Sequence, residues 1–463
     1  MTLKRQAVDF TQGSIIRNLI AFSVPILLGE LLQNLYNSVD ALAVGNYAGE
    51  SALAAVTVCG FISQLIVSFF NGMSVGSNVV VSRAFGAGDR QELDRSIQVS
   101  FTFSALLGLI LSLLGILFAP LLLQLVSAGP EVFDEALIYL RIYLAGVLFI
   151  VIYNSGAGIL RAIGDSGTPF YFLAAACTIN IVLDIVLVKY CRMGVAGAGI
   201  ATVVSQGISV GCVYRAINRR RGICCFSLRA LGGEGKRIIF SILDIGVAAG
   251  LQGALISLSN LVIARYINRF STASIAGIGI AQRIDKFIVL PTKSFGITMT
   301  TYVSQNLGAK RYDRIRDGCL RCTALSFAIT LGMSALVYVF TGQCVSIFNT
   351  NPEVIRVGSA TLHVFLPFLL FMAIRELLLG ILRGYKRART PMILSLIGMI
   401  GVRQLFLSVA MSRGEDIRYI FWCYPIAWAS TAILLLIYFL AVKKKLTGLN
   451  GNADNTGEDM TPA

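Results

Sequence analysis

The sequence predicts an all-α integral membrane protein whose twelve transmembrane helices form two related six-helix halves. Three observations predict this fold. Apolar residues make up 56% of the 463-residue chain and charged residues only 14%, with a mean hydropathy of +0.75, whereas soluble domains carry roughly 25% charged residues. Apolar stretches long enough to cross a bilayer recur along the whole chain. The second half of the sequence also repeats the first.

Twelve apolar stretches approach or exceed the ~20 residues that cross ~30 Å of hydrocarbon. Short polar, Gly-rich or Arg-rich breaks separate them. The first follows a polar start without the small-residue cleavage pattern of a signal peptide, so we expect it to stay in the membrane. The expected spans are residues 16–45, 52–81, 96–126, 134–157, 169–190, 195–217, 238–267, 273–303, 318–341, 355–382, 391–412 and 417–442.

Basic residues predict the orientation of these helices, because short cytoplasmic loops hold the excess of Lys and Arg. With a cytoplasmic N-terminus, most of the 39 Lys and Arg residues fall in cytoplasmic segments and few in outer loops. The net charge of +15 then reflects membrane topology. We expect the basic residues to lie next to anionic lipid headgroups and not to bind nucleic acid. We expect a monomeric, multi-pass protein with both termini in the cytoplasm.

An internal repeat relates the two halves at an offset of 222 residues. It predicts an N-terminal bundle (1–215), a cytoplasmic linker (216–237), a C-terminal bundle (238–445) and a disordered polar tail (446–463). Six helices is an even number, so both halves enter the membrane from the same side, as in a parallel repeat. The offset aligns Val81-Ser82 with Val303-Ser304, Gly86-Ala87 with Gly308-Ala309, Gly158–Arg161 with Gly380–Arg383, and Thr168-Pro169 with Thr390-Pro391.

Polar residues form a stripe along the first span. Glu30, Gln33, Asn37 and Asp40 follow one another at helical spacing, with Tyr36 at the flank of the stripe. Ionisable side chains are costly in hydrocarbon, by roughly 2.5–3.5 kcal/mol on insertion scales. The stripe is therefore expected to face protein or water.

A second polar pair lies on the fifth span, where Asn180 and Asp184 share one face. Two carboxylates, Asp40 and Asp184, can serve reversible protonation or bind Na⁺ through hard oxygen ligands, and either use couples an ion gradient to movement. The alternative for each is a helix-end carboxylate that reaches the outer surface, for Asp184 beside Lys189. Adding 222 to 180 and 184 gives Val402 and Phe406, so only one half has this pair.

The second half has charges of its own, for which we favour internal ion pairs over chemistry. Arg283 with Asp285 and Arg375 with Glu376 bring opposite charges close together in sequence. These residues are secondary site candidates, and Glu376 is the first that we would test.

Several stretches resemble the multidrug and toxic compound extrusion (MATE) family, over about residues 12–445. They are PILLGELLQNLYNSVDALAVG from Pro25, VSRAFGAGD from Val81, GILRAIGDSGTPF from Gly158, NIVLD from Asn180, VAGAGIATVVSQ from Val195 and VSQNLGAK from Val303.

The resemblance implies two six-helix bundles that face each other around a central cavity. It implies a secondary-active antiporter of a prokaryotic plasma membrane that exports organic, often cationic, compounds in exchange for H⁺ or Na⁺, without enzymatic activity or a cofactor. A rival is a flippase for a lipid-linked precursor, which needs a basic cavity and a side gate. A non-transport membrane enzyme or receptor is a third alternative, but the chain has one histidine and no sizeable soluble domain.

The resemblance also implies site residues. In the branch similar to the DNA-damage-inducible prokaryotic members, the ion-coupling pattern matches Asp40, Asn180, Asp184 and Thr202, which would hold H⁺ or Na⁺. Another bacterial branch of the family couples ions through acidic residues at the positions where this chain has Gln252 and Met372. This difference argues against a cation site in the C-terminal half. The substrate is expected in the central cavity, with these side chains nearby: Glu30, Gln33, Tyr36, Asn37 and Asn154.

Overall fold

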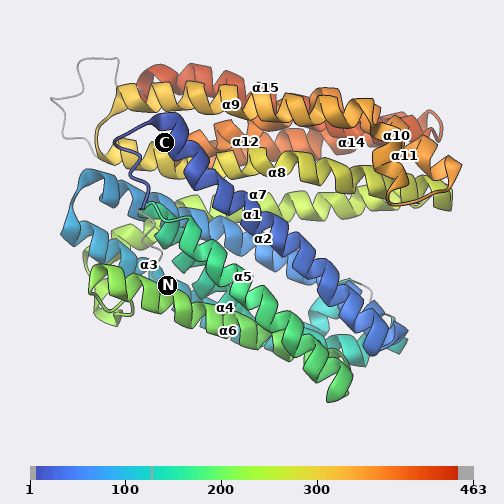
Figure 1. The fold of residues 1–463 in the computed structure, drawn as a ribbon, viewed down its shortest axis with the longest axis horizontal. Helices are drawn as coiled ribbons and strands as arrows, with labels where there is room; N and C mark the ends of the chain where they lie inside the picture. The colour runs from blue at the N-terminus through green and yellow to red at the C-terminus, as the bar shows by residue number, and fades with distance from the viewer. Residues whose placement is uncertain (1–6, 127–128, 447–463) are drawn as a thin grey trace.

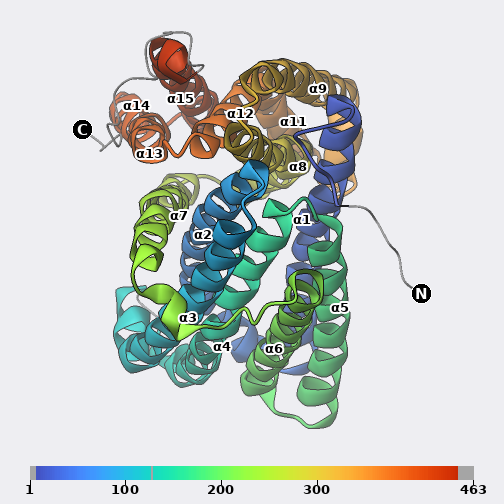
Figure 2. The same cartoon turned by 90° about the vertical axis from the view of Figure 1, so that its left-hand side faces the viewer.

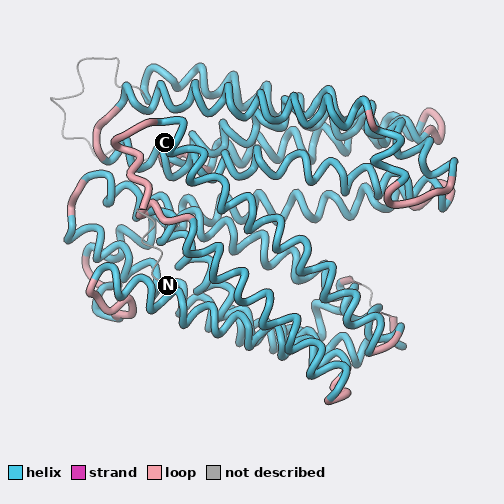
Figure 3. Tube along the Cα trace, in the orientation of Figure 1, coloured by secondary structure: helices cyan, strands magenta, loops and turns pink. Residues whose placement is uncertain are grey.

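The structure is a computed structural model that describes residues 7–126 and 129–446, apart from the side chains of residues 37–43 and 444–445. Within these ranges every regular element is a helix, and the loops gather at the two ends of the molecule (Figure 3). The predicted all-α fold is confirmed. The predicted tail lies outside the described residues, apart from Leu446.

Helix ends in the first half follow local sequence signals. Gly88 has a left-handed φ of 72° and ends α2, and the Asp89 carboxylate accepts hydrogen bonds from the backbone N–H groups of Gln91 and Glu92 to cap α3. The long helices of this half are α1 (Ile15–Tyr47), α2 (Glu50–Ala87), α3 (Arg90–Leu125), α4 (Pro130–Ala162), α5 (Gly167–Asp184) with the π-helical η1 (Ile185–Tyr190), and α6 (Gly194–Arg221).

The second half repeats this order, with two of its spans divided into shorter pieces. Its helices are α7 (Glu234–Ile267), α8 (Thr272–Gly308), α9 (Tyr312–Val339), α10 (Thr341–Ser346), α11 (Pro352–Phe365), η3 (Leu366–Phe368), α12 (Leu369–Gly384), α13 (Arg389–Leu396), the π-helical η4 (Ile397–Val402), α14 (Arg403–Ser412) and α15 (Ile417–Leu446).

Eleven helices in the described part of the chain are long and apolar enough to cross a membrane. α8 is a twelfth helix of sufficient length, with 37 residues, but Arg283, Asp285, Lys286 and Lys293 make it less apolar. The helices agree with the twelve predicted spans, counting α11 to α12 and α13 to α14 as one span each. The chain is thus a multi-pass membrane protein.

The helices form two groups that lie side by side at one end of the molecule and diverge toward the other (Figure 1). One group holds α1 to α6 and the other holds α7 to α15, as the view along the molecule also shows (Figure 2). We call the end where α1 begins and the groups touch the closed end, and the opposite end the open end.

Two contacts at the closed end are related to each other by the internal repeat. A Cβ atom on Gly86 would lie 1.9 Å from the carbonyl oxygen of Gln305, and one on Gly308 would lie 2.1 Å from that of Arg83. Adding 222 to 83 and 86 gives 305 and 308, so each contact is the counterpart of the other. α2 and α8 therefore pack across the two halves in a pseudo-two-fold arrangement, with glycines allowing the close approach.

α1 connects both groups. Near its start, Phe22 and Ile26 pack with Phe295 and Met299 of α8 in one buried cluster. Further along, the hydroxyl of Tyr36 reaches Thr202 of α6. α1 thus leaves the second half and joins the first as it crosses the molecule (Figure 1).

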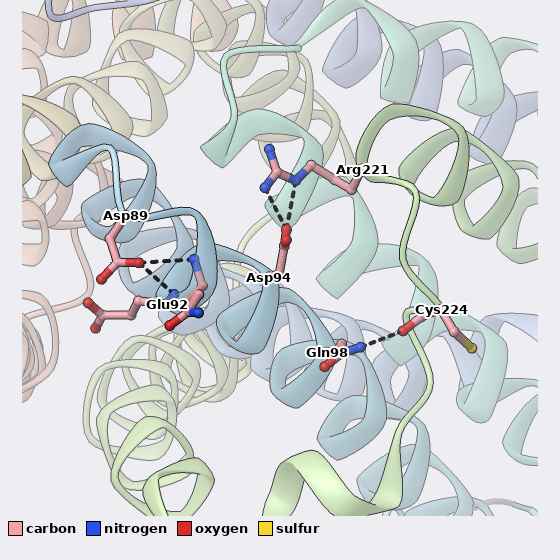
Figure 4. A network of polar contacts seen from close by, with 7 residues as sticks. Asp89, Glu92, Asp94, Gln98, Arg221 and Cys224 are labelled. Atoms are coloured by element: carbon pink, nitrogen blue, oxygen red, sulfur yellow. Dashed lines mark hydrogen bonds and ion pairs between the residues drawn. The ribbon is translucent and has the colours of Figure 1, made fainter.

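Residues 222–233 join α6 to α7 and are fixed to α3 (Figure 4). The Arg221 guanidinium lies 2.6 Å from Asp94 Oδ1, and Gln98 donates a hydrogen bond of 3.0 Å to the carbonyl oxygen of Cys224. The segment includes the short helix η2 (Leu228–Leu231). It is shorter than the stretch predicted at 216–237 because α6 and α7 both continue through charged residues that end an apolar pattern but not a helix.

Candidate functional site

Three polar residues meet inside the first half, where α5 packs on α6. Asn180 and Asp184 lie one turn apart on α5, and each is only 1% exposed. With the Asn180 amide oriented so that both of its polar atoms are satisfied, its nitrogen donates to Asp184 Oδ2 at 2.9 Å. Its oxygen then accepts from the backbone N–H of Thr202 at 3.1 Å. The structure thus brings together three of the four residues predicted to couple ions.

The fourth predicted residue, Asp40, lies on α1, but its side chain and that of Asn37 are outside the described residues. Tyr36 shows where α1 passes: its hydroxyl lies 3.5 Å from Thr202 Oγ1. The contribution of Asp40 stays a prediction.

The burial of Asp184 contradicts the alternative that it reaches the outer surface beside Lys189. Lys189 instead places its ammonium over the rings of Tyr47 and Tyr190, 4.9 and 5.6 Å from their centroids. Directly after Asp184 the helix widens from α to π geometry in η1. Single π turns inside helices are frequent at functional sites.

A cavity of about 700 Å³ lies between the two halves. Its walls come from α1, α2, α4, α5 and α6 of the first half and from α7, α8 and α12 of the second. Thr202 lines it and also bonds Asn180 through its backbone, so Thr202 joins the buried cluster to the cavity. The predicted cavity residues with described side chains all line it: Glu30, Gln33, Tyr36 and Asn154.

Acidic side chains in the cavity wall are held by basic ones. Glu30 of α1 accepts a 2.7 Å hydrogen bond from Lys293 of α8, an ion pair between the halves. Glu376 of α12, the favoured secondary candidate, lines the cavity and lies 2.8 Å from the Nη1 atom of Arg375. The predicted Arg375–Glu376 pair is confirmed.

The other predicted pair does not form within the described residues. Arg283 is exposed and makes no ion pair with Asp285, and neither residue lines the cavity. Two residues apart on a helix, their side chains point in nearly opposite directions. Asp285 keeps a buried carboxylate oxygen that has no hydrogen-bond partner among the atoms described.

Arg161 and Arg383, which lie just beyond the predicted spans 134–157 and 355–382, are cavity residues. They belong to the last turns of α4 and α12 and line the cavity. Arg161 donates to Ser74 Oγ at 3.3 Å, and Arg383 donates to Gln252 Oε1 at 2.7 Å. The repeat aligns the two arginines and so carries a signal for them, but charge at the end of an apolar stretch predicts a loop by hydropathy alone.

This arrangement suits an exchange between a buried carboxylate and a water-accessible space. A carboxylate as buried as Asp184 is unfavourable when charged, unless a proton, a cation or hydrogen bonds offset its charge. Asp184, Asn180 and Thr202 carry carboxylate, amide and hydroxyl groups, whose oxygens are donor atoms for H⁺ or a hard cation such as Na⁺. In the structure the Asn180 nitrogen faces Asp184 and its oxygen accepts from Thr202, so a cation would require the amide to turn.

A family model described as MatE matches residues 25–186 and 248–407 of the chain. The matched stretches begin 223 residues apart (248 − 25) and end 221 apart (407 − 186), which agrees with the offset of 222.

Curated relatives match along nearly the whole chain. The probable multidrug resistance protein YoeA of Bacillus subtilis is 27% identical over 443 residues, which are 94% of this chain and 96% of the relative. YpnP of the same organism, also a probable multidrug resistance protein, is 29% identical over 406 residues, covering 87% and 90% of the two chains. The multidrug export protein MepA of Staphylococcus haemolyticus is 23% identical, with 96% and 97% covered.

Solved structures share the fold. An outward-facing multidrug resistance MATE transporter of the MOP superfamily aligns with a TM-score of 0.86 at 22% identity, covering 98% of this chain and 100% of that one. A MOP superfamily transporter from Pyrococcus furiosus, described as having a binding pocket of reverse polarity, aligns with a TM-score of 0.82 at 22% identity, covering 97% and 99%.

Proposed function

Because the chain belongs to the MatE family of multidrug efflux transporters, we propose that it is a secondary-active antiporter that exports organic compounds in exchange for H⁺ or Na⁺. The observation that carries the proposal is the position of Asp184. It is buried against Asn180, and Thr202 joins this cluster to the cavity between the halves.

The proposed coupling site consists of Asp184, Asn180 and Thr202, completed by Asp40. Protonation or Na⁺ binding removes the buried negative charge of Asp184, and release restores it. Since Tyr36 of α1 touches Thr202, a change at the cluster reaches the helix that also packs against α8. The halves would then move relative to each other and expose the cavity alternately to the two sides.

The positive-inside rule supports the orientation in which the closed end faces the cytoplasm. At that end, Arg90 and Arg95 lie at the start of α3 and Arg311 and Arg314 at the start of α9, and both described ends of the chain lie there (Figure 1). In this orientation the structure corresponds to a state open to the outside. We propose a monomer in a prokaryotic plasma membrane, as the sequence predicts.

The proposed substrates are amphiphilic organic molecules bound in the cavity. Tyr143, Tyr153 and Phe170 offer aromatic surface for an apolar body. The cationic charge expected of the substrate rests on the family resemblance alone. Both acids in the described wall, Glu30 and Glu376, already have basic partners.

The test is transport in proteoliposomes with H⁺ and Na⁺ gradients imposed separately. Asp184→Asn and Asp40→Asn should each abolish gradient-driven dye efflux, because an amide neither titrates nor neutralises a cation. Asp313→Asn makes the same change on an exposed turn of α9 and should leave efflux intact. Unimpaired efflux in both the Asp184→Asn and the Asp40→Asn variant would remove this site assignment.

A lipid-precursor flippase is the alternative that one observation favours. Three basic residues, Arg161, Lys293 and Arg383, line the cavity together with two acids. Flipping of a labelled anionic lipid without any requirement for an ion gradient would favour this alternative over antiport.

A further inference from the structure

The most informative pair outside the proposed ion site is Gln252 with Arg383, both in the second half. Arg383 lines the cavity and donates to Gln252 Oε1 at 2.7 Å. Gln252 is 3% exposed, and its neighbours Ala249 and Gly253 belong to the cavity wall. The amide oxygen of Gln252 therefore holds the guanidinium in place at the wall.

The repeat identifies the counterparts of this pair in the first half. Subtracting 222 from 252 and 383 gives Glu30 and Arg161. The first half thus has a carboxylate where the second half has an amide. The Gln252 amide accepts a hydrogen bond from Arg383 but cannot neutralise its charge.

No carboxylate contacts Arg383 in the part of the chain that the structure covers, because the guanidinium makes no ion pair within 4 Å there. Glu376 lies two turns earlier on α12 and bonds Arg375. Glu30 bonds Lys293. At the second-half wall Arg383 therefore presents a positive charge that no described carboxylate contacts.

The amide nitrogen of Gln252, unlike its oxygen, is not used by any described residue. This Nε2 atom is buried and has no hydrogen-bond partner among the described residues. A buried donor without an acceptor is unfavourable, and an arriving acceptor removes that cost. Gln252 thus places an N–H without a described partner next to the Arg383 guanidinium that lines the cavity, and neighbouring donors of this kind recognise the paired oxygens of a carboxylate or phosphate.

We propose that Arg383, positioned by Gln252, binds a carboxylate or phosphate group of the transported compound. The substrates are then amphiphilic anions or zwitterions, with the anionic group on the second-half wall and the apolar body against the cavity aromatics. This inference rests on the proposed efflux function and deepens it. The two halves divide the charges: the first exchanges a cation at Asp184, and the second receives an anion at Arg383.

Two xanthene dyes of opposite charge test the proposal: fluorescein, an anion with a free carboxylate, and rhodamine 6G, a cation whose carboxyl group is esterified. Binding to the purified protein is measured by fluorescence anisotropy, and transport is measured in proteoliposomes. The wild type should prefer fluorescein. Gln252→Glu gives Arg383 a carboxylate partner, so fluorescein binding should weaken about tenfold or more while rhodamine 6G binding strengthens.

Two further variants separate the site from the general charge of the cavity. Gln206→Glu adds the same charge to the cavity wall on α6, in the other half, and should weaken fluorescein binding less than Gln252→Glu does. Gln252→Met removes the amide but adds no charge, so it should weaken fluorescein binding without reversing the preference. It also serves as the test variant if Gln252→Glu does not fold. Equal losses in Gln206→Glu and Gln252→Glu would overturn the site.

The readouts separate this inference from the proposed function. Transport of rhodamine 6G alone, unchanged by Gln252→Glu, would support efflux and overturn the anion site. Fluorescein binding that depends on Gln252, without transport under either gradient, would support the site and count against efflux. Absence of fluorescein binding would overturn the inference. A parallel assay with NBD-labelled phosphatidylglycerol in the bilayer shows whether the anionic group belongs to a lipid or to a soluble compound.

Discussion

The Nζ atom of Lys293 lies 2.7 Å from Oε2 of Glu30, so an ion pair joins α8 to α1 across the cavity. Closer to the closed end, seven residues earlier on α1 and five residues later on α8, the same helices meet again through Ser23 and Thr298, whose hydroxyls are 2.8 Å apart. α1 is the first helix of one half by sequence, but over this stretch it is attached to the other half. Any movement that separates α1 from α8 must break the Glu30–Lys293 pair.

We predict a small but measurable coupling between Glu30 and Lys293. Their side chains are 26% and 48% exposed, so water screens the pair, and exposed pairs contribute about 0.2–1 kcal/mol. A double-mutant cycle with Glu30→Gln, Lys293→Gln and the double variant, followed by thermal unfolding in detergent, should give a coupling energy in that range.

An outer ion pair of the second half is the control for this cycle. Arg269 and Glu415 lie 3.4 Å apart and are 54% and 58% exposed, and we expect their coupling to be close to zero. A Glu30–Lys293 coupling no larger than that of the control pair would show that the cavity contact does not hold the halves together.

Sequence reasoning predicted the fold well because the repeat and the hydropathy are properties of local sequence. The offset of 222 was found from short identical pieces, and in the structure it relates Gly86 with Gln305 to Gly308 with Arg83. The i, i+4 spacing of Asn180 and Asp184 correctly predicted that the two would meet on one face of α5.

The cavity wall was harder to predict because it depends on which helices face each other. Arg161 and Arg383 end apolar stretches, and that position alone does not distinguish a loop from a helix end facing a water-filled cavity. Lys293 pairs with Glu30, from a helix of the other half. No spacing rule within one helix predicts such a contact.

We predict that alanine at Gly86 or Gly308 destabilises the closed end. The added Cβ would lie 1.9 Å from the Gln305 carbonyl oxygen or 2.1 Å from that of Arg83, so α2 and α8 must move apart. Overpacking of this kind costs roughly 1–3 kcal/mol. Both variants should melt at a lower temperature than the wild type in detergent, by similar amounts because the two contacts are counterparts.

Gly279→Ala is the matched control for these variants. Gly279 also lies on α8, but an added Cβ there would meet no atom within 4 Å, and alanine favours a helix over glycine by about 1 kcal/mol. This variant should melt at the same temperature as the wild type or higher. If all three alanine variants behaved alike, helix propensity and not contact between the halves would explain the effect.

Lys386 gives a prediction about pH, outside the membrane spans. It lies in the turn between α12 and α13 with a left-handed φ of 61°. Burial, helped by the charges of Arg83 and Arg237 and opposed by those of Glu92 and Asp244, lowers the pKa of its ammonium group to about 8. The ordinary pKa is 10.5, so between about pH 8 and 10.5 the unfolded chain binds more protons than the folded protein.

The free energy of unfolding should therefore rise as the pH rises through this window, and the penalty for the buried charge is fully present below pH 8. Lys386→Asn removes the charge, and asparagine tolerates the left-handed backbone. This variant should melt above the wild type at pH 7, and the gap should narrow as the pH approaches 10. Lys310→Asn makes the same substitution at another left-handed residue, with a φ of 55°. It measures how much of the change in melting temperature comes from placing asparagine in this backbone conformation. A gap for Lys386→Asn that stayed constant from pH 7 to pH 10 would mean that the charge of Lys386 does not limit stability at the closed end.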